Sequence, residues 1–422
     1  MATTTTVHVF LLLISYVHAQ EDEGPESFAG HHLFSVKIDT KQHLKTLLEL
    51  RDVLELDVWN DAIKEGRTGL IRVPPESVDG LMEAMHSSGM QYNIRSDDLQ
   101  RMINEEKHLL ASEERYGTAK LSLQQLDVSR YHSYKTISEA LVMYPREYSF
   151  VQTTSIGQTH EGEEIMAIQI ARAPDKPIVL MDCGIHAREW VTIAACMYII
   201  NELLNNIKDP YVNERSAMYE WRIIPCMNPD GYEYSRTTNR FWRKNRSVQW
   251  TSNGTKCYGT DLNRNFDVSF CSAPDTPDPC KETFCGRAPF SEPETTAFRD
   301  YVTTFKDRIV FYFSIHSFGD LWLIPYGFRV DKPPDYDSLM TRAKRGVQAI
   351  WELSGEAYRI GPVSSVLYIA PGTAIDWMYV KKGVKMSFTL EISGEKSGFL
   401  LNQSSIVRTS RDLWTGILAA IG

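Results

Sequence analysis

Three apolar runs constrain the fold of this 422-residue chain more than any other feature. They read PIVLMDC at 177–183, WRIIPCM at 221–227 and IVFYFSI at 309–315, and helical stretches such as WVTIAACMYIINELLNN at 190–206 lie between them. Strands that are apolar at nearly every position are typical of parallel sheets that helices cover on both faces. The sequence therefore predicts an α/β domain with a mixed, mostly parallel, twisted sheet and helices on both faces.

Residues 32–96 consist of shorter strand-like and helix-like segments. Four short segments alternate like strands and two have helical periodicity, in the order HLFSVKI (32–38), KQHLKTLLELRDV (41–53, helical), LELDVWN (54–60), GLIRV (69–73), PPESVDGLMEAMHSSG (74–89, helical) and MQYNIRS (90–96). This β-α-β-β-α-β order predicts a small antiparallel sheet under two helices, an α+β open sandwich. The next stretch, residues 97–117, predicts a charged connecting helix without a strong apolar face.

The first residues predict a secretory signal peptide. Residues 7–16 form an apolar core that is too short to span a bilayer, and the small-residue pattern VHA at 17–19 precedes an acidic stretch. We expect cleavage after Ala19 and an extracellular protein, and no later apolar run is long enough for a membrane helix. A buried amino-terminal strand is the alternative interpretation.

The cysteines and the charge agree with a secreted, soluble protein. All seven cysteines lie between residues 183 and 285, so six can pair as disulfides and one remains. Three sequons, at Asn245, Asn253 and Asn402, can carry glycans where they are exposed. The net charge of −9 argues against a nucleic acid as partner, and nothing suggests more than a monomer.

Polar side chains gather where the apolar runs end. His186 and Glu189 lie between the run that ends at Cys183 and the helix expected near Trp190, and His316 directly follows the run at 309–315. Ligand sites in such sheets lie beyond the carboxyl ends of the strands. Two imidazoles and one carboxylate with an open fourth position indicate a catalytic zinc site. A hydrogen-bonded core histidine is the alternative for His316.

A further carboxylate lies in KMSFTLEISGEKSGF at 385–399. Alternation places Thr389 and Glu391 on the same face of a strand, with Glu391 at its carboxyl end. A carboxylate beside a zinc site is suited to be a general base, and an exposed strand-end glutamate is the alternative.

Arginines concentrate in NRFWRKNR at 239–246 and TDLNRNF at 260–266. A planar guanidinium matches a carboxylate with two hydrogen bonds, so one of these arginines can anchor an anionic substrate end and another can stabilise an oxyanion. A solvated basic face is the alternative interpretation.

Together these residues resemble the zinc metallocarboxypeptidases of the A/B type. The motifs HAREW, NPDGYEYS, RFWRKNR, DLNRNF, SIHS, IDW and GFLL occur in that family's order and spacing. The resemblance runs from about residue 20 to the last residue and implies an inhibitory pro-domain with a connecting helix at 20–115, after the signal peptide at 1–19, and a catalytic domain at 121–422. It implies peptide and protein C-termini as substrates, and activation by a trypsin-like protease at Arg115 or Lys120.

The resemblance also assigns roles. His186, Glu189 and His316 would hold one Zn²⁺, and Glu391 would take the proton from the attacking water. The substrate contacts would be Arg243 for the oxyanion, Asn263, Arg264 and Tyr368 for the terminal carboxylate, and Arg188, Ser317 and Phe318 for the preceding residue. Tyrosine is common in the family at Phe318.

Specificity is expected from Ile375, which corresponds to the base of the family's primary pocket. An acidic residue there selects Lys or Arg, whereas isoleucine leaves a buried cation without a partner. We therefore expect an A-type preference for aliphatic and aromatic C-terminal residues. The expected pocket walls are Leu323, Gly327, Ala370 and Thr389.

Two departures from the family pattern concern this pocket. Thr373 replaces a glycine usual in A-type pockets, and we expect it to crowd a large aromatic side chain. The stretch MYVKKG at 378–383 is one residue longer than usual and adds Lys381 and Lys382 nearby.

The cysteines match a disulfide pattern more familiar in B-type enzymes. The resemblance implies the pairs Cys183–Cys196, Cys257–Cys280 and Cys271–Cys285 and leaves Cys226 as a buried thiol. Two alternatives therefore stay open beside the A-type enzyme. One is the same enzyme with B-type specificity for basic residues, and the other is a non-catalytic binding protein on the same scaffold.

Overall fold

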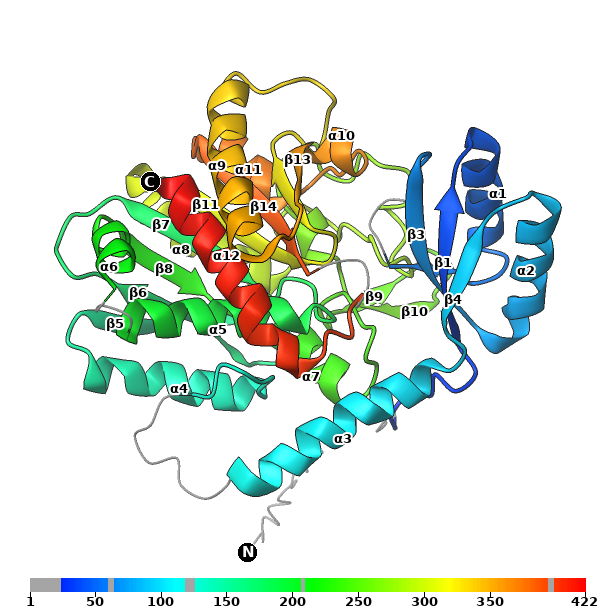
Figure 1. The fold of residues 1–422 in the computed structure, drawn as a ribbon, viewed down its shortest axis with the longest axis horizontal. Helices are drawn as coiled ribbons and strands as arrows, with labels where there is room; N and C mark the ends of the chain where they lie inside the picture. The colour runs from blue at the N-terminus through cyan, green and yellow to red at the C-terminus, as the bar shows by residue number, and fades with distance from the viewer. Residues whose placement is uncertain (1–23, 60–63, 118–125, 206–208, 394–397) are drawn as a thin grey trace, which may run out of the picture.

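The computed structural model describes residues 24–59, 64–117, 126–205, 209–393 and 398–422 (Figure 1). The predicted signal peptide and Lys120 lie outside the described residues, and so does the side chain of Arg115. No helix in the described part of the chain is long and apolar enough to cross a membrane.

The larger domain is built on an eight-stranded sheet with the strand order β13-β12-β14-β11-β7-β8-β6-β5. Four of the seven neighbouring pairs are parallel and three are antiparallel, which confirms the mixed, mostly parallel sheet. The strands are β5 (Val151–Gln158), β6 (Glu164–Ile170), β7 (Ile178–Cys183), β8 (Glu220–Ile224), β11 (Ile309–Ser317), β12 (Leu321–Ile324), β13 (Arg359–Pro362) and β14 (Met386–Ile392).

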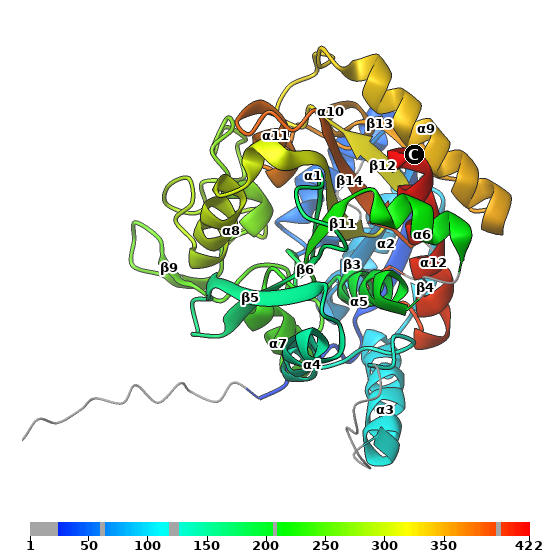
Figure 2. The same ribbon diagram turned by 90° about the vertical axis from the view of Figure 1, so that its left-hand side faces the viewer.

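Helices cover both faces of this sheet, because successive side chains of its apolar strands point to opposite sides. On β11, Phe311 and Phe313 belong to one buried cluster and Tyr312 to the other. The first cluster contains residues of α4 (Tyr134–Glu147), α5 (Trp190–Asn205), α9 (Tyr336–Ser354) and α12 (Ile406–Ile421). The second contains residues of α8 (Pro293–Thr303) and α11 (Ala374–Val380), and Figure 2 shows these two helices across the strands from α9 and α12.

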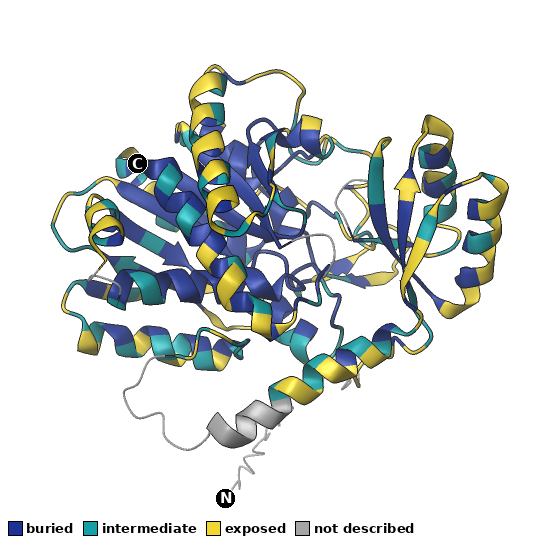
Figure 3. Cartoon of the chain, viewed as in Figure 1, coloured by how far each residue is buried: buried dark blue, intermediate teal, exposed yellow. Residues whose placement is uncertain are grey.

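The centre of the large domain is the most buried part of the molecule (Figure 3). All six residues of β7 are buried, and so is most of α5. An element that is apolar all round must lie inside a protein. The remaining elements of this domain are α6 (Pro210–Ala217), α7 (Pro229–Thr237), α10 (Val363–Val366), the hairpin of β9 (Val248–Trp250) and β10 (Lys256–Tyr258), and the short helices η2 (Leu262–Arg264), η3 (Lys306–Arg308) and η4 (Gln403–Ser405).

The small domain has the predicted β-α-β-β-α-β order. Its sheet runs β2-β3-β1-β4, and every pair is antiparallel. The elements are β1 (His32–Ile38), α1 (Lys41–Arg51), β2 (Asp57–Val58), β3 (Arg67–Val73), α2 (Val78–Ser87) and β4 (Tyr92–Ser96).

The two faces of the small sheet have different neighbours. Phe34 and Ile71 pack in a cluster with residues of α1 and α2. Leu33 and Leu70, on the other face, join a cluster that includes Phe241, Phe318 and Phe399 of the large domain. The small domain therefore uses one face for its own core and presents the other to the large domain.

The connecting helix α3 (Leu99–Gly117) differs from the expectation. Leu99, Met102 and Ile103 pack into the cluster between the two domains. The spacing of these three residues places them on one side of the first turns of the helix. Leu110, farther along the helix, packs against the core of the large domain. The expectation of no strong apolar face was wrong, because these few apolar residues are hidden among charged ones in the sequence.

The disulfides join the pairs that the resemblance implies. Cys183 pairs with Cys196, Cys257 with Cys280 and Cys271 with Cys285. Cys226 is a free, buried thiol.

Candidate active site

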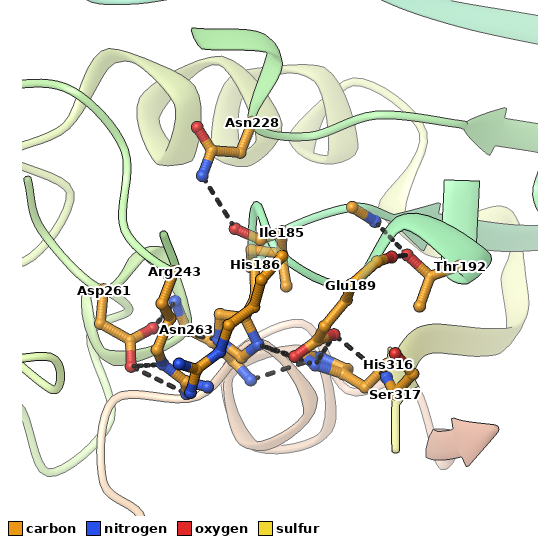
Figure 4. Close-up of polar contacts among 12 residues, drawn as sticks. Ile185, His186, Glu189, Thr192, Asn228, Arg243, Asp261, Asn263, His316 and Ser317 are labelled. Atoms are coloured by element: carbon orange, nitrogen blue, oxygen red, sulfur yellow. Dashed lines mark hydrogen bonds and ion pairs between the residues drawn. The ribbon is translucent and has the colours of Figure 1, made fainter. Parts of the chain in front are cut away.

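Three metal-binding side chains meet at the carboxyl ends of β7 and β11 (Figure 4). Nδ1 of His186 lies 2.7 Å from Oε1 of Glu189 and 3.2 Å from Nδ1 of His316. Nδ1 of His316 lies 3.3 Å from Oε2 of Glu189. All three side chains are buried, so their donor atoms converge on one point away from bulk water.

The donor set fits Zn²⁺. Bonds of 2.0–2.2 Å in tetrahedral geometry separate the ligand atoms by about 3.3–3.6 Å. The distances from His316 to His186 and Glu189, 3.2 and 3.3 Å, are close to this separation, and the 2.7 Å between His186 and Glu189 is shorter. Two imidazoles and a carboxylate leave a fourth position for water or substrate.

The loop between β7 and α5 holds His186 and Glu189 through backbone contacts. Gly184 has φ +64°, and a Cβ there would lie 2.6 Å from Cγ1 of Ile193. Thr192 ties the loop to the helix, since its hydroxyl accepts from the Gly184 amide and donates to the Glu189 carbonyl. The strand end, the glycine turn and the helix start together fix the direction of both side chains.

Asp261 is a site residue that the sequence interpretation missed. Its Oδ1 lies 3.2 Å from Nε2 of His186, and its Oδ2 accepts from Nε and Nη2 of Arg243 at 3.2 and 3.1 Å. Burial favours the neutral acid, but Arg243 and Arg264 outweigh burial and hold the pKa of Asp261 well below its ordinary value. An ionised Asp261 favours the tautomer of His186 that carries its proton on Nε2, and this tautomer has the lone pair of Nδ1 available for a metal ion.

The sequence around Asp261 was recognised as a motif, but nothing in it marks this aspartate as the partner of a histidine. It lies in the stretch TDLNRNF, two residues before Asn263, and its side chain also accepts from the Asn263 amide. A partner of a metal-binding histidine has no fixed sequence spacing, so only the fold brings Asp261 to His186.

The residues expected to hold a substrate carboxylate lie on two neighbouring segments. Nη2 of Arg264, at the end of η2, donates to the hydroxyl of Tyr368 at 2.5 Å. Oδ1 of Asn263 accepts from the Ala374 amide at 2.9 Å, which ties η2 to the segment after Tyr368. Gly372 has φ +71°, and a Cβ there would lie 2.2 Å from the carbonyl oxygen of Arg264. Only glycine permits this approach.

The register of β14 places Glu391 beside the histidine cluster. Glu391 pairs with His316 on β11, and Thr389 pairs with Ser314. The neighbouring strand β12 places Leu323 against Thr389. The strand thus brings the candidate base to the cluster and Thr389 to the expected pocket wall.

The expected pocket is lined by apolar side chains. Ile375 is buried in a cluster with Leu321, Leu323, Val363, Val366 and Ala370. The adjacent Asp376 accepts from the backbone amides of Gly327 and Phe328. Burial raises the pKa of Asp376 to about 6. Its oxygens are occupied by the backbone, so they are not arranged to receive a cation in the pocket.

The two lysines that follow α11, Lys381 and Lys382, form contacts outside the expected pocket. Nζ of Lys381 lies 3.2 Å from the carboxylate of Asp267, and Nζ of Lys382 donates to the hydroxyl of Thr303 at 2.7 Å. Both ammonium groups thus have partners that do not belong to the apolar cluster around Ile375.

The residues expected at the preceding subsite lie under the small domain. Arg188 pairs with Asp57 at 3.5 Å and lies 4.3 Å above the ring of Phe399. Phe318 packs against Phe399, and the amide of Ser317 donates to Glu189. A cavity of about 620 Å³ separates the domains here, lined by Asp57, Arg72, Arg188, Arg243 and Tyr368 among others.

The structure thus groups the candidate residues into three neighbouring sets. They are the histidine cluster with Asp261 and Glu391, the Arg264–Tyr368 pair beside the apolar cluster that contains Ile375, and Arg188 at the domain interface.

Both domains match described families. Residues 137–416 match the family model described as zinc carboxypeptidase, and residues 34–106 match the model described as carboxypeptidase activation peptide. Carboxypeptidase A1 of Rattus norvegicus is 33% identical over 401 residues, which are 94% of each chain. Carboxypeptidase B of Bos taurus is 32% identical over 416 residues, which are 97% of this chain and 96% of the relative.

A solved structure agrees with these matches. The carboxypeptidase A from Helicoverpa armigera has a TM-score of 0.84 with this chain at 30% identity, over 94% of this chain and 97% of that one. Both A- and B-type enzymes are among the relatives, so the comparisons establish the fold and the family but leave the pocket preference open.

Proposed function

The chain belongs to the zinc carboxypeptidase family, and from this premise we propose that it is a secreted zymogen whose mature form releases aliphatic and aromatic residues from peptide C-termini. The family establishes the zinc-dependent hydrolysis of peptides and the proteolytic activation. The preference for apolar residues is carried by one observation, the position of Ile375 among buried apolar side chains.

Zinc is the cofactor of this family, and we assign His186, Glu189 and His316 as its ligands. Bound there, Zn²⁺ supplies Lewis acidity that polarises the scissile carbonyl and makes water a stronger acid. Asp261 contributes by keeping the His186 ring in one orientation.

The other site residues bind substrate and move protons. Arg264 receives the terminal carboxylate with two parallel hydrogen bonds, and Asn263 and Tyr368 add donors from the same side. Arg243, held by Asp261, stabilises the oxyanion that develops on the carbonyl. Glu391 accepts a proton from the attacking water and passes it to the leaving amine.

The pocket supports release of apolar residues on energetic grounds. A Lys or Arg side chain that enters it loses its water, and no carboxylate at position 375 replaces the lost hydration. An apolar side chain gains from burial by about 25 cal/mol per Å² of apolar surface. The pocket therefore favours the apolar residue and disfavours the cation.

The small domain supports the zymogen assignment. Asp57, Trp59 and α3 cover the side of the site where the rest of a peptide substrate must lie. Arg240 binds Glu106 of α3 through two hydrogen bonds, at 2.6 and 3.1 Å. We assign the activating cut to Arg115 or Lys120, which trypsin-like proteases recognise, and the product to a monomer.

A panel of peptides tests the specificity. The trypsin-treated protein is assayed for kcat/KM on otherwise identical peptides that end in Leu, Phe, Trp and Arg. We expect Leu and Phe to exceed Arg by about 100-fold or more, because a buried unpaired charge costs several kcal/mol. We expect Trp to be slower than Phe if Thr373 narrows the pocket. A preference for Arg would overturn the assignment of Ile375.

Secretion has a separate test. Expression in a secretory host should deliver the protein to the medium, and amino-terminal sequencing should begin at Gln20. Protein that stays in the cells with Met1 in place would contradict the signal peptide without affecting the enzymatic assignment.

A further inference from the structure

The three sequons lie in very different surroundings. Asn245 is fully buried, and its Nδ2 donates to Oε2 of Glu292 at 2.9 Å and to Oε2 of Glu294 at 3.0 Å. An N-linked sugar would occupy that nitrogen and separate the asparagine from both carboxylates. The folded protein therefore has no room for a glycan at Asn245.

Asn253 lies at the exposed tip of the hairpin between β9 and β10, which reaches the edge of the molecule in Figure 2. The amide of Thr251 donates to the Thr255 carbonyl at 2.9 Å, and the amide of Gly254 donates to the Thr251 carbonyl at 3.1 Å. Gly254 has φ +85°, and a Cβ there would meet nothing within 4 Å. The turn is thus closed by its own backbone and open to solvent.

The side chain of Asn253 is fixed through its oxygen alone. Oδ1 accepts from the hydroxyls of Thr251 and Thr255, the latter at 3.1 Å, and from the Thr255 amide at 3.4 Å. None of these bonds uses Nδ2, the atom to which an N-linked sugar is attached. The Asn253–Gly254–Thr255 sequon therefore presents its acceptor nitrogen on a rigid, exposed turn.

An exposed aromatic ring stands three residues before this asparagine. Trp250 ends β9, is 53% exposed and pairs across the hairpin with Lys256. It also contributes, with Phe270, Pro274 and Pro277, to an open groove of about 700 Å³. An aromatic face attracts the polarised C–H groups of a pyranose ring, so this apolar surface suits a sugar attached beside it.

Asn402 provides the contrast within the same chain. Phe399 stands three residues before it, at the same spacing as Trp250 before Asn253, but is only 5% exposed. Its ring packs against Trp59 and Phe318 in the domain interface. A sugar on Asn402 would find no exposed ring at that spacing in the zymogen.

We propose that Asn253 is an N-glycosylation site of this protein and that the first sugars of its glycan pack on Trp250 and the groove beside it. In the modification, Nδ2 of Asn253 bonds to C1 of an oligosaccharide carried on a lipid diphosphate. The C1–O bond to the diphosphate breaks, the diphosphate leaves with the electron pair, and the amide loses one proton. The inference rests on the proposed secretion, since this transfer takes place in the secretory pathway.

Mass spectrometry of the full-length chain from a glycosylating secretory host tests the attachment. Peptides are treated with a glycan-releasing amidase in heavy-oxygen water, which turns each modified asparagine into labelled aspartate. We expect the label at Asn253 and none at Asn245, and Asn253→Gln and Thr255→Ala should each abolish the label at position 253. Secreted, active protein with an unlabelled Asn253 would overturn the proposal.

Heat unfolding of the same proteins tests the packing on Trp250. Trp250→Ala should lower the unfolding midpoint by about 2–4 °C in the glycosylated protein and by clearly less in the Asn253→Gln background. Trp351→Ala, which removes an exposed tryptophan of α9, is the matched control and should act equally in both backgrounds. Equal effects of Trp250→Ala in both backgrounds would contradict the contact between ring and sugar.

A replaced leader sequence distinguishes a failure of the proposed secretion from a failure of the proposed glycan site. If the chain stays in the cytosol, its first 19 residues are replaced by the leader of a known secreted protein and the label is measured again. Label at Asn253 would then support the glycan site while the native leader fails, and its absence from secreted protein would overturn the site.

Discussion

The two sheets of this molecule differ in what covers their second face. The eight-stranded sheet packs helices of its own domain on both faces, and its chemistry lies at the strand ends. The four-stranded sheet packs α1 and α2 on one face, and on the other face Leu33 and Leu70 join a cluster shared with α3 and with aromatic residues of the large domain. A sheet with an exposed apolar face needs a partner to cover it. Here the partner is the surface of the large domain around Phe241, Phe318 and Phe399.

This difference between the two sheets explains how one chain contains both an enzyme domain and the domain that covers it. The large domain buries a complete core without the small one, so its site should survive removal of residues 20–115. The small domain depends on the large one for its second face, and it contacts Arg188, Arg240, Phe241 and Phe399 of the large domain there.

The largest effect is expected from Glu391→Gln in the large sheet. The amide keeps the shape of the side chain but does not accept the proton of water, so kcat of the trypsin-treated form should fall by about 10³-fold or more. Zinc content and the unfolding midpoint should stay unchanged. Glu352→Gln, at an exposed position of α9, is the control and should keep full activity. Turnover near that of the wild type would remove Glu391 from the mechanism.

The next effect concerns the pocket. Ile375→Asp places a carboxylate where a C-terminal Lys or Arg would bring its charge, so kcat/KM on Leu and Phe substrates should fall by about 100-fold while that on Arg substrates rises. Paired assays on the trypsin-treated form measure both changes. Ile375→Leu, which keeps an apolar base, should retain the original preference. Loss of activity on Leu, Phe and Arg substrates alike would mean that position 375 supports the fold rather than the specificity.

A smaller effect is expected in the small domain from Trp59→Ala. The ring of Trp59 lies 4.7 Å from that of Phe241 and 5.3 Å from that of Phe399. Its removal leaves a cavity in the interface, and loss of about 1.4 kcal/mol of docking energy would already raise the open population about tenfold. The untreated zymogen should therefore show at least about tenfold higher basal activity. The substitution lies before the activation site, so trypsin-treated variant and wild type should be equally active.

Trp351→Ala, on the surface of α9, controls for a general loss of stability. If the basal activity of Trp59→Ala equals that of this control, the interface cluster does not maintain the block.

The smallest effect concerns pH. Burial of Asp57 favours its neutral form, but Arg188 and Arg72 outweigh burial and hold its pKa below the ordinary 3.8. A carboxylate with a lowered pKa stabilises the docked state above that ordinary value, and the contribution is lost only as the pH falls through the lowered pKa. Zymogen held between about pH 5 and pH 8 and assayed at neutral pH should therefore show unchanged basal activity.

Asp57→Asn removes the charge at every pH and serves as the comparison. Its basal activity should be several-fold above that of the wild-type zymogen throughout the same range. Wild-type zymogen that gains activity at pH 5 would show that another titrating group controls the interface.

The sequence by itself determined the local elements and the identity of the chemistry. Apolar runs such as IVFYFSI require a doubly covered strand, and alternation in the region before residue 97 defines the small sheet, because each pattern reflects only which side of its own strand is buried. His186, Glu189, His316 and Glu391 could be predicted as site residues because strand ends are recognisable in the sequence.

Only the tertiary structure decided which distant groups touch. Asp261 lies 75 residues from His186, and Asp57 lies 131 residues before Arg188, yet the members of each pair are in direct polar contact. The tertiary fold likewise separated three sequons of the same type into a buried one, an exposed one beside an exposed ring and an exposed one beside a buried ring. Periodicity records what each residue faces across its own element, whereas such contacts depend on how whole elements pack, which no local pattern encodes.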